Sequence, residues 1–389
     1  MKPDIPVSPS IMIIAGEASG DMHGAGLIKA LQQLKPAARF FGMGGKELTK
    51  AGVEIVCDVE KTAVMGVTEI FSALGGIFST LNRIKTELRQ RKPDLVILVD
   101  FAGFNLRIAR LAHKLNIPVF YYIPPKVWVW RKNRIKLLAK YVSRTGVILP
   151  FEEIYLKKRG VQANYVGNPV LEEVVVKMDR EAFCKKYGID SGKALVGILP
   201  GSRKKEVAYL LPVFLEAARR MQKKYSRELV FLIPLASTLS LADLENCGLR
   251  EFSGDLEIHL LAEDRYDLMA ACDAAMAASG TVTLELAVLD IPMVVAYIFA
   301  PLSYAIGKLF IDIPYFSLVN IIAGKSVVTE LLQDQVHPGS VEIELARVVF
   351  DENVRKYMMD DYHLIRKLLG KECASENAAR IALDTMTNR

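Results

Sequence analysis

The chain has 389 residues, 51% of them hydrophobic, and a formal net charge of +6 at pH 7. That length exceeds what a single hydrophobic core usually organises, so we expect two domains. The five cysteines are scattered without paired spacing, which excludes a disulfide scaffold and a zinc site. The basic charge suits anionic small molecules or an anionic membrane surface, and no nucleic-acid-binding pattern accompanies it.

Two segments of the sequence indicate where in the cell the protein is expected. The first 21 residues carry prolines and an early aspartate and lack the apolar core of a signal peptide, so we expect a cytoplasmic protein. The most hydrophobic stretch, residues 291–316, is interrupted by three prolines, a lysine and an aspartate. A membrane-spanning helix needs about 20 mostly apolar residues in a row. We therefore expect a buried strand there, followed by an amphipathic surface segment from Leu302 to Phe316.

Apolar runs alternate with helical patterns along the whole chain. The first strand is expected at residues 10–16, and the helix after it has Asp21 as its predicted N-cap. The later strands are expected at residues 94–100, 117–123, 194–201, 228–235, 274–279 and 291–298. Such alternation is typical of parallel, doubly wound sheets. We therefore predict an α/β protein with two Rossmann-like domains.

The domain boundary is predicted at Asn168-Pro169, a turn signal followed by a highly charged stretch. The first domain would span residues 1–168 and the second residues 169–359. Residues 360–389 end in a helical pattern, which we expect to pack back on the first domain or on a partner subunit. In open α/β sheets, ligands bind beyond the carboxyl ends of the strands, so the turns that follow the apolar runs are the candidate sites.

The turn after the first strand is rich in glycine. It reads GEASGD and matches neither a dinucleotide-binding fingerprint, nor a P-loop, nor a nucleophile elbow. Glycines that lead into a helix still expose backbone N–H groups to a ligand. Tight-turn geometry alone explains the pattern equally well. The candidate ligand-loop residues are Glu17, Ser19, Gly20 and Asp21.

Asp100 ends the strand DLVILVD. A carboxylate at that position can act as the general base for a sugar hydroxyl. The alternative is that Asp100 only caps the helix that begins near Asn105. Position along the chain does not decide between these two roles.

The stretch LPGSRKKE places Gly201, Ser202 and Arg203 where a strand leads into a helix. Glycine lets the backbone approach a ligand, the helix start offers N–H donors, and the guanidinium matches phosphate oxygens. We predict a diphosphate site. The alternative is an ordinary capped turn with a solvated basic cluster.

A second turn of this kind reads SGT, with Ser279, Gly280 and Thr281 at the start of a helix. Glu285 follows within that helix, where its carboxylate could accept hydrogen bonds from both ribose hydroxyls. The alternative is that Ser279 caps the helix and Glu285 has an ordinary helical role. The histidines have no metal-ligand spacing, so we expect arginine and helix N-termini, with no metal or cofactor, to neutralise the diphosphate.

The stretch VWVWRK contains the only two tryptophans of the chain and precedes an amphipathic basic helix. Interfacial helices have this composition, and so does a surface helix with an aromatic anchor in the core. The candidate membrane or acyl-chain contacts are Trp128, Trp130, Arg131 and Lys132.

Taken in order, GEASGD, PDLVILVDFAGFN, VWVWR, LPFE, VGNPV, LPGSRKKEV, ASGTVTLE and SLVNIIAG resemble the lipid-A-disaccharide synthase family. That family comprises inverting GT-B glycosyltransferases, whose two domains face a cleft. The resemblance implies transfer of 2,3-diacylglucosamine from its UDP conjugate to the 6-hydroxyl of 2,3-diacylglucosamine 1-phosphate, without a metal. The product is the disaccharide core of lipid A in lipopolysaccharide.

The resemblance also implies roles for individual residues. Asp100 would be the general base, Arg203 would stabilise the departing UDP, and Asn320 would lie in a motif lining the donor side. It further implies a protein peripherally associated with the cytoplasmic leaflet of the inner membrane, and a homodimer. Two departures stand out: Gly103 replaces a second acidic residue after Asp100, and Lys126 follows a Pro-Pro pair where the family has Ser-Pro.

Three alternatives stay open from the residues alone. A UDP-sugar 2-epimerase has the same two-domain architecture without an acceptor. A glycosyltransferase acting on a polyprenyl-linked sugar is a nearer rival. A membrane-associated UDP-sugar-binding protein would be a non-enzymatic alternative.

Overall fold

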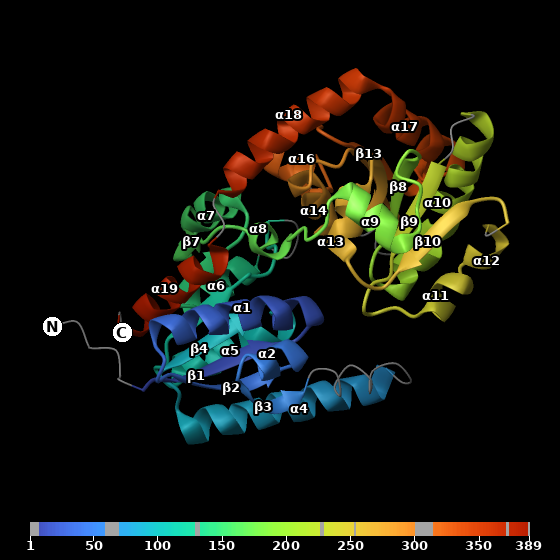
Figure 1. Ribbon diagram of the computed structural model, residues 1–389. Coiled ribbons are helices and arrows are strands. Elements are labelled where there is room, and N and C mark those ends of the chain that lie inside the picture. The colour runs from blue at the N-terminus through green and yellow to red at the C-terminus, as the bar shows by residue number, and fades with distance from the viewer. Residues whose placement is uncertain are drawn as a thin grey trace. The chain divides into compact units, whose positions relative to one another are not determined.

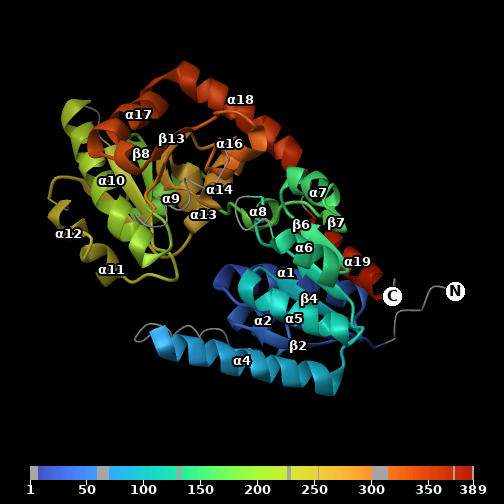
Figure 2. The same cartoon turned by 180° about the vertical axis from the view of Figure 1, so that it is seen from behind.

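The computed structural model describes residues 8–58, 70–128, 133–225, 229–252, 254–299, 314–370 and 373–387. The chain divides into two compact units, Met1–Pro169 with Lys371–Arg389, and Val170–Gly370. Each unit contains one parallel sheet with helices on its faces (Figures 1 and 2).

The first unit is built on a seven-stranded parallel sheet in the order β3-β2-β1-β4-β5-β6-β7. The order reverses between β1 and β4, which makes their carboxyl ends the topological switch point where open α/β sheets bind ligands. The strands are β1 (Ser10–Ala15), β2 (Arg39–Gly44), β3 (Glu54–Asp58), β4 (Leu95–Val99), β5 (Val119–Tyr122), β6 (Arg144–Val147) and β7 (Ala163–Tyr165).

Both faces of this sheet are covered. On β1, Ile11 and Ile13 join one core cluster, whereas Met12 and Ile14 join the other, because successive side chains point to opposite faces. Figures 1 and 2 show α1 and α4 on opposite sides of the sheet. The helices are α1 (Ala18–Leu34), α2 (Lys46–Lys50), α4 (Ile70–Arg91), α5 (Ala102–Lys114), α6 (Arg134–Tyr141), α7 (Pro150–Lys157) and α19 (Ala374–Thr387).

The last helix, α19, returns to the first unit. Its Ala378, Ala379 and Ala382 are fully buried, and Asn377 Nδ2 donates to the Val166 carbonyl at 3.0 Å. The sequence placed the start of this returning segment at residue 360. In the structure α18 (Glu352–Leu369) stays with the second unit, so the return begins after Gly370.

The second unit repeats the same topology with six parallel strands in the order β10-β9-β8-β11-β12-β13. Its switch point lies between β8 and β11. The strands are β8 (Ala194–Leu199), β9 (Leu229–Pro234), β10 (Glu257–Leu261), β11 (Ala274–Ala278), β12 (Met293–Tyr297) and β13 (Thr329–Leu332). The predicted class, two doubly wound α/β domains, is confirmed.

The remaining elements of the second unit are helices. They are α8 (Val170–Glu173), α9 (Arg180–Tyr187), α10 (Lys204–Lys224), α11 (Leu241–Glu245), α12 (Leu249–Phe252), α13 (Arg265–Ala271), α14 (Val282–Val288), α16 (Leu318–Ala323), η1 (Gln333–Gln335), α17 (Pro338–Phe350) and α18. Within the described parts of the chain, no helix combines the length and the apolar character needed to cross a membrane.

Candidate active site

Asp100 sits directly after β4, at the switch point of the first sheet. Both Asp100 and Phe101 have left-handed backbones, with φ of +48° and +45°. Asn105 Nδ2 donates to the carbonyls of Val99 at 3.1 Å and Asp100 at 2.8 Å, and the Tyr121 hydroxyl donates to the Asp100 carbonyl at 2.6 Å. Such backbone strain costs on the order of 1–3 kcal/mol per residue and persists only where neighbours hold it. These bonds therefore fix the turn that carries the Asp100 carboxylate.

The electrostatics agree with this placement. Burial and the nearby Asp100 carboxylate both raise the pKa of Tyr121, so its hydroxyl stays protonated and remains a donor. The N-cap position of α5 falls on Phe101, so Asp100 is not the cap residue that the alternative interpretation required.

The β1–α1 turn lies against the Asp100 turn. A Cβ atom at Gly16 would come within 2.1 Å of the Phe101 ring, so only glycine lets the ring lie there. Glu17 is the N-cap residue of α1 without a side-chain cap bond, and Glu17 and Ser19 are both exposed. Of the predicted loop residues, these two lie at the surface, in the stretch that follows the contact of Gly16 with Phe101.

Gly20 and Asp21 are instead buried, and Asp21 has a structural partner. Its carboxylate accepts from the backbone N–H groups of Gly45 at 2.6 Å, Glu47 at 2.8 Å and Leu48 at 3.3 Å. The prediction that Asp21 caps α1 is wrong, because α1 begins three residues earlier. Asp21 caps α2 instead, since the first N–H groups of that helix lack partners within it.

In the second unit, the turn after β8 brings Arg203 to the amino end of the long helix α10. Gly201 has a φ of +110°, and a Cβ atom there would lie 2.7 Å from a carboxylate oxygen of Glu206. Arg203 is the N-cap residue of α10, and its side chain is 73% exposed, with Nη1 3.0 Å from Glu206 Oε1. Ser202 is also exposed. An exposed guanidinium beside a helix N-terminus is suited to bind an anion.

The SGT turn lies next to this one. A Cβ atom built on Gly201 would contact the Cβ of Ala278, the last residue of β11, at 3.6 Å. Ser279 Oγ donates to the Phe316 carbonyl at 3.0 Å, and Gly280 and Thr281 are exposed. The two predicted turns are therefore neighbours at the switch point of the second sheet.

Glu285 is buried inside α14 and forms an ion pair with Arg265 at the start of α13. Burial raises the pKa of Glu285, and the Arg265 charge opposes that shift. Arg265 is not predictable from the sequence, because no motif surrounds it and its partner is 20 residues away. The predicted ribose contact thus already shares its carboxylate with a cation.

Asn320 serves the scaffold. Its Nδ2 donates to the Val328 carbonyl and to Glu330 Oε1, both at 2.9 Å, and its Oδ1 accepts from Val327 N at 2.7 Å and Val328 N at 3.0 Å. An amide side chain offers two donors and two acceptor sites, so all of its hydrogen-bonding capacity is used. Asn320 therefore braces the loop between α16 and β13, and its place in a motif lining the donor side stays a prediction.

Trp128 is half-buried and packs on α7. Its Nε1 donates to Glu152 Oε1 at 2.8 Å, and its ring stands edge-on to Phe151 with centroids 5.0 Å apart. This geometry supports the aromatic-anchor interpretation for Trp128. Glu152 was quoted in the LPFE stretch but given no role; it is 4% exposed, and burial raises its pKa.

The other residues of this prediction lie outside the described residues. They are Trp130, Arg131 and Lys132, together with most of the expected surface segment Leu302–Phe316.

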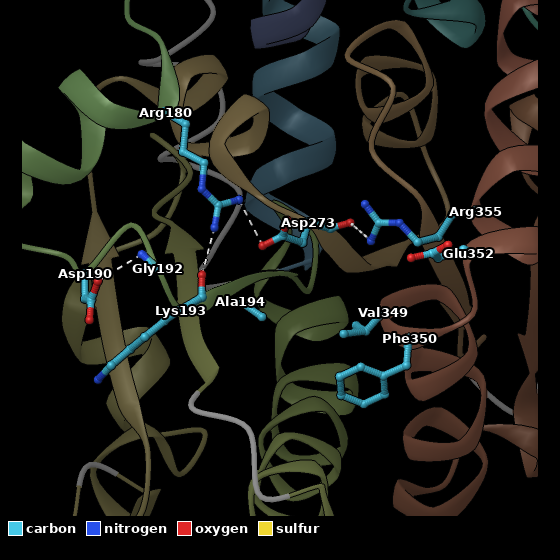
Figure 3. Close-up of a pocket in the computed structure, with 10 residues that line it drawn as sticks. All are labelled: Arg180, Asp190, Gly192, Lys193, Ala194, Asp273, Val349, Phe350, Glu352 and Arg355. Carbon is cyan, nitrogen blue, oxygen red and sulfur yellow. Dashed lines mark hydrogen bonds and ion pairs between the residues drawn. The ribbon is translucent and has the colours of Figure 1, made fainter.

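A cavity of about 670 Å³ opens at the opposite edge of the second sheet, where β8 and β11 begin (Figure 3). Its charged side chains serve the scaffold. Arg180 Nη1 bonds the Asp273 carboxylate at 2.9 Å, and Arg355 Nη1 bonds the Asp273 carbonyl at 2.9 Å. These two arginines approach Asp273 from α9 and α18 and tie both helices to the strand (Figure 3). This cavity is therefore not the predicted diphosphate site.

A comparison with known protein families shows to which family the chain belongs. A family model described as lipid-A-disaccharide synthetase matches residues 11–384. The chain belongs to this family. A relative from Syntrophus aciditrophicus (strain SB), named lipid-A-disaccharide synthase, is 41% identical over 383 residues and is covered, like this chain, to 97%. The match to the lipid-A-disaccharide synthetase family thus spans both units and the positions of every motif quoted above.

Solved structures show the fold. A UDP-GlcNAc 2-epimerase from Neisseria meningitidis, bound to UDP-GlcNAc, has a TM-score of 0.65 at 13% identity, covering 98% of this chain and 100% of that one. The glycotransferase of kitacinnamycin has the same TM-score, identity and coverage. At such identity the likeness concerns architecture alone. Membership of the lipid-A-disaccharide synthetase family confirms the prediction of a glycosyltransferase and does not support the alternative of a UDP-sugar 2-epimerase.

Proposed function

We propose that the chain transfers 2,3-diacylglucosamine from its UDP conjugate to the 6-hydroxyl of 2,3-diacylglucosamine 1-phosphate, with inversion and release of UDP. The observation that carries this proposal is the family match over residues 11–384. The geometry supports it, because each sheet presents one chemically apt turn at its switch point. One turn carries a carboxylate and the other an exposed arginine at a helix N-terminus.

Asp100 acts as the general base. Its carboxylate takes the proton of the acceptor 6-hydroxyl as that oxygen attacks the anomeric carbon of the donor sugar. The new glycosidic bond forms on the face opposite the bond to UDP, which breaks. The Asn105 and Tyr121 bonds to the Asp100 turn keep the carboxylate in position, and a misplaced base loses much of its effect.

Arg203 and the amino end of α10 bind the diphosphate of the donor. Negative charge grows on UDP as the glycosidic bond breaks, so a fixed cation and helix N–H groups stabilise the transition state more than the ground state. Ser202 and the adjacent turn Ser279–Thr281 contact the nucleotide. Glu285 is the proposed partner of the ribose hydroxyls.

The decisive experiment mixes the purified chain with both acylated glucosamine substrates and analyses the products by mass spectrometry. We expect a monophosphorylated, tetra-acylated disaccharide together with UDP. A control with UDP-N-acetylglucosamine alone should yield no epimer. An epimer in that control, or UDP binding without any disaccharide, would contradict the proposal.

Two further features belong to the proposal. Both substrates carry acyl chains, and the chain is basic, so we propose peripheral association with an anionic membrane leaflet. Sedimentation with anionic vesicles tests it. The resemblance given above also implies a homodimer, and analytical ultracentrifugation tests that state.

A further inference from the structure

A second cavity, of about 370 Å³, opens on the first unit between α5 and α6. Its lining residues are basic, apolar or glycine: Gly103, Leu106, Arg107, Arg110, Arg134, Leu137 and Tyr141. None of these described lining residues is acidic. The cavity is therefore strongly cationic with a partly apolar wall.

Helical spacing explains why these residues face each other. On α5, Gly103, Arg107 and Arg110 are four and then three residues apart and lie on one face. The opposite face of α5 is packed in the core, with Phe104 and Ile108 buried. On α6, the lining positions likewise recur at intervals of three and four residues, so two facing stripes form the groove.

Two of the three arginines are available for a ligand. Arg107 and Arg110 are exposed, and among the described residues no carboxylate pairs with either of them. Leu106 is buried beneath them, and Leu137 is 40% exposed at the rim. The arrangement joins cationic groups to apolar surface, which suits a phosphate that is carried on a lipid.

One end of the cavity adjoins the candidate base. Gly103 follows Asp100 by three residues, and apart from its chain neighbours and the backbone of its own helix, no atom lies within 4 Å of the position that its Cβ would occupy. Arg134 acts electrostatically on Tyr121, whose hydroxyl bonds the Asp100 carbonyl. Glycine at position 103 also means that no second carboxylate joins Asp100 at this end of the cavity.

We propose that this cavity binds a phosphate monoester on an acylated sugar, namely the 1-phosphate of the acceptor. This inference rests on the proposed function. Arginine forks pair with phosphate oxygens in charge-assisted hydrogen bonds, and several of them can hold a dianion. The phosphate on C1 and the hydroxymethyl group on C5 are separate substituents on the two carbons that flank the ring oxygen. A phosphate held by Arg107 and Arg110 thus leaves the hydroxyl to reach toward Asp100.

The test compares the double variant Arg107→Ala/Arg110→Ala with wild type. Binding of the phosphorylated acceptor is measured by calorimetry in neutral detergent, and transfer is measured separately at varied acceptor concentration. We expect the acceptor Kd and KM to rise about 150-fold or more, because two charge-assisted bonds of at least about 1.5 kcal/mol each amount to about 3 kcal/mol. The KM for the donor should stay unchanged. The double variant Lys136→Ala/Lys140→Ala removes equal charge from α6 outside the cavity and should bind the acceptor like wild type.

Two further arms separate the sources of phosphate. Wild type should prefer the phosphorylated over the dephosphorylated acceptor, and the arginine variant should lose that preference. Sedimentation with phosphatidylglycerol vesicles should be the same for wild type and the arginine variant. Loss of vesicle binding with unchanged acceptor affinity would overturn the proposal and assign the arginines to membrane headgroups.

The two proposals fail in different ways. Wild-type chain that binds the phosphorylated acceptor through these arginines but forms no disaccharide would refute the proposed function and keep this site. Disaccharide formation that is unaffected by the arginine variant, with acceptor affinity unchanged, would refute this site alone. Thermal melting of each variant verifies that the exposed arginines are not needed for folding.

Discussion

The two switch-point turns hold their chemical groups in different ways. After β4, the strain falls on Asp100 itself, and side chains of Asn105 and Tyr121 clamp its carbonyl. After β8, the positive φ falls on Gly201, and Arg203 is 73% exposed with Glu206 beside it. A general base must be held within hydrogen-bond distance of the proton that it removes. An exposed guanidinium can instead move from solvent to pair with a diphosphate. With the proposed roles, the first turn suits a group that must be placed precisely, and the second suits a group that must reach a ligand.

Replacing Asp100 with Asn tests the turn after β4 and should have the largest effect. The amide cannot take the proton, so we expect kcat to fall about 1,000-fold, within the range for loss of a general base. UDP affinity, measured by calorimetry, should not change. The control is Asp94→Asn at the amino end of the same strand, where the carboxylate bonds Ser10 N at 2.9 Å. Loss of UDP binding in the Asp100 variant would place the carboxylate on the donor side instead.

Replacing Arg203 with Ala tests the turn after β8. Loss of a charge-assisted contact to phosphate costs about 1.5–3 kcal/mol, so the Kd for UDP should rise about 10- to 100-fold. Because the charge on UDP grows during the reaction, kcat should fall as well. Lys205→Ala, at an exposed position in the first turn of α10, is the matched control. If the Arg203 variant had the kinetics of wild type, the prediction that this turn binds the diphosphate would be refuted.

Replacing Asn320 with Ala separates scaffold from ligand contact in the second unit. The change leaves the N–H groups of Val327 and Val328 without their acceptor, which costs about 1–3 kcal/mol for each buried group. We expect urea unfolding to report a destabilisation of about 3 kcal/mol in total. The surface variant Lys205→Ala should unfold like wild type. If the Asn320 variant were as stable as wild type but did not bind UDP, Asn320 would be a ligand contact and not a scaffold residue.

The smallest expected effect is a pH dependence, and each unit supplies one residue for it. Burial raises the pKa of Glu152 in the first unit and of Glu285 in the second above the ordinary value of 4.5. A carboxyl with a raised native pKa stabilises the fold fully below its unfolded pKa, and this contribution is lost as pH rises through the native pKa. Stability should therefore fall as pH rises above about 4.5.

The matched variants Glu152→Gln and Glu285→Gln isolate these contributions. Each glutamine keeps the shape of the side chain and removes the titration, so the slope of unfolding free energy against pH should flatten. In Glu152→Gln, the amide oxygen of the glutamine can still accept the hydrogen bond from Trp128 Nε1. In Glu285→Gln, the Arg265 guanidinium loses the carboxylate with which it forms an ion pair. We expect Glu152→Gln to gain stability at neutral pH relative to Glu285→Gln. A slope that neither variant changes would mean that other groups control the pH dependence.

Local patterns in the sequence determined much of the molecule. Uninterrupted apolar runs predicted strands buried on both faces, and turn residues after them predicted where ligands approach. The positions of Asp100 and Arg203 beyond the ends of strands followed from those patterns. These features depend on neighbours within a few residues, which a sequence displays directly.

Only the tertiary structure decided what each polar side chain bonds. Asp21 caps a helix 24 residues away, Trp128 meets Glu152 across 24 residues, and Glu285 meets Arg265 across 20. The order of strands, which makes two turns of each sheet neighbours, is likewise a long-range property. A buried polar group must find a partner wherever packing brings one, because leaving it unpaired is costly. Periodicity along the chain identifies the group to be satisfied, and the packing of distant segments chooses its partner.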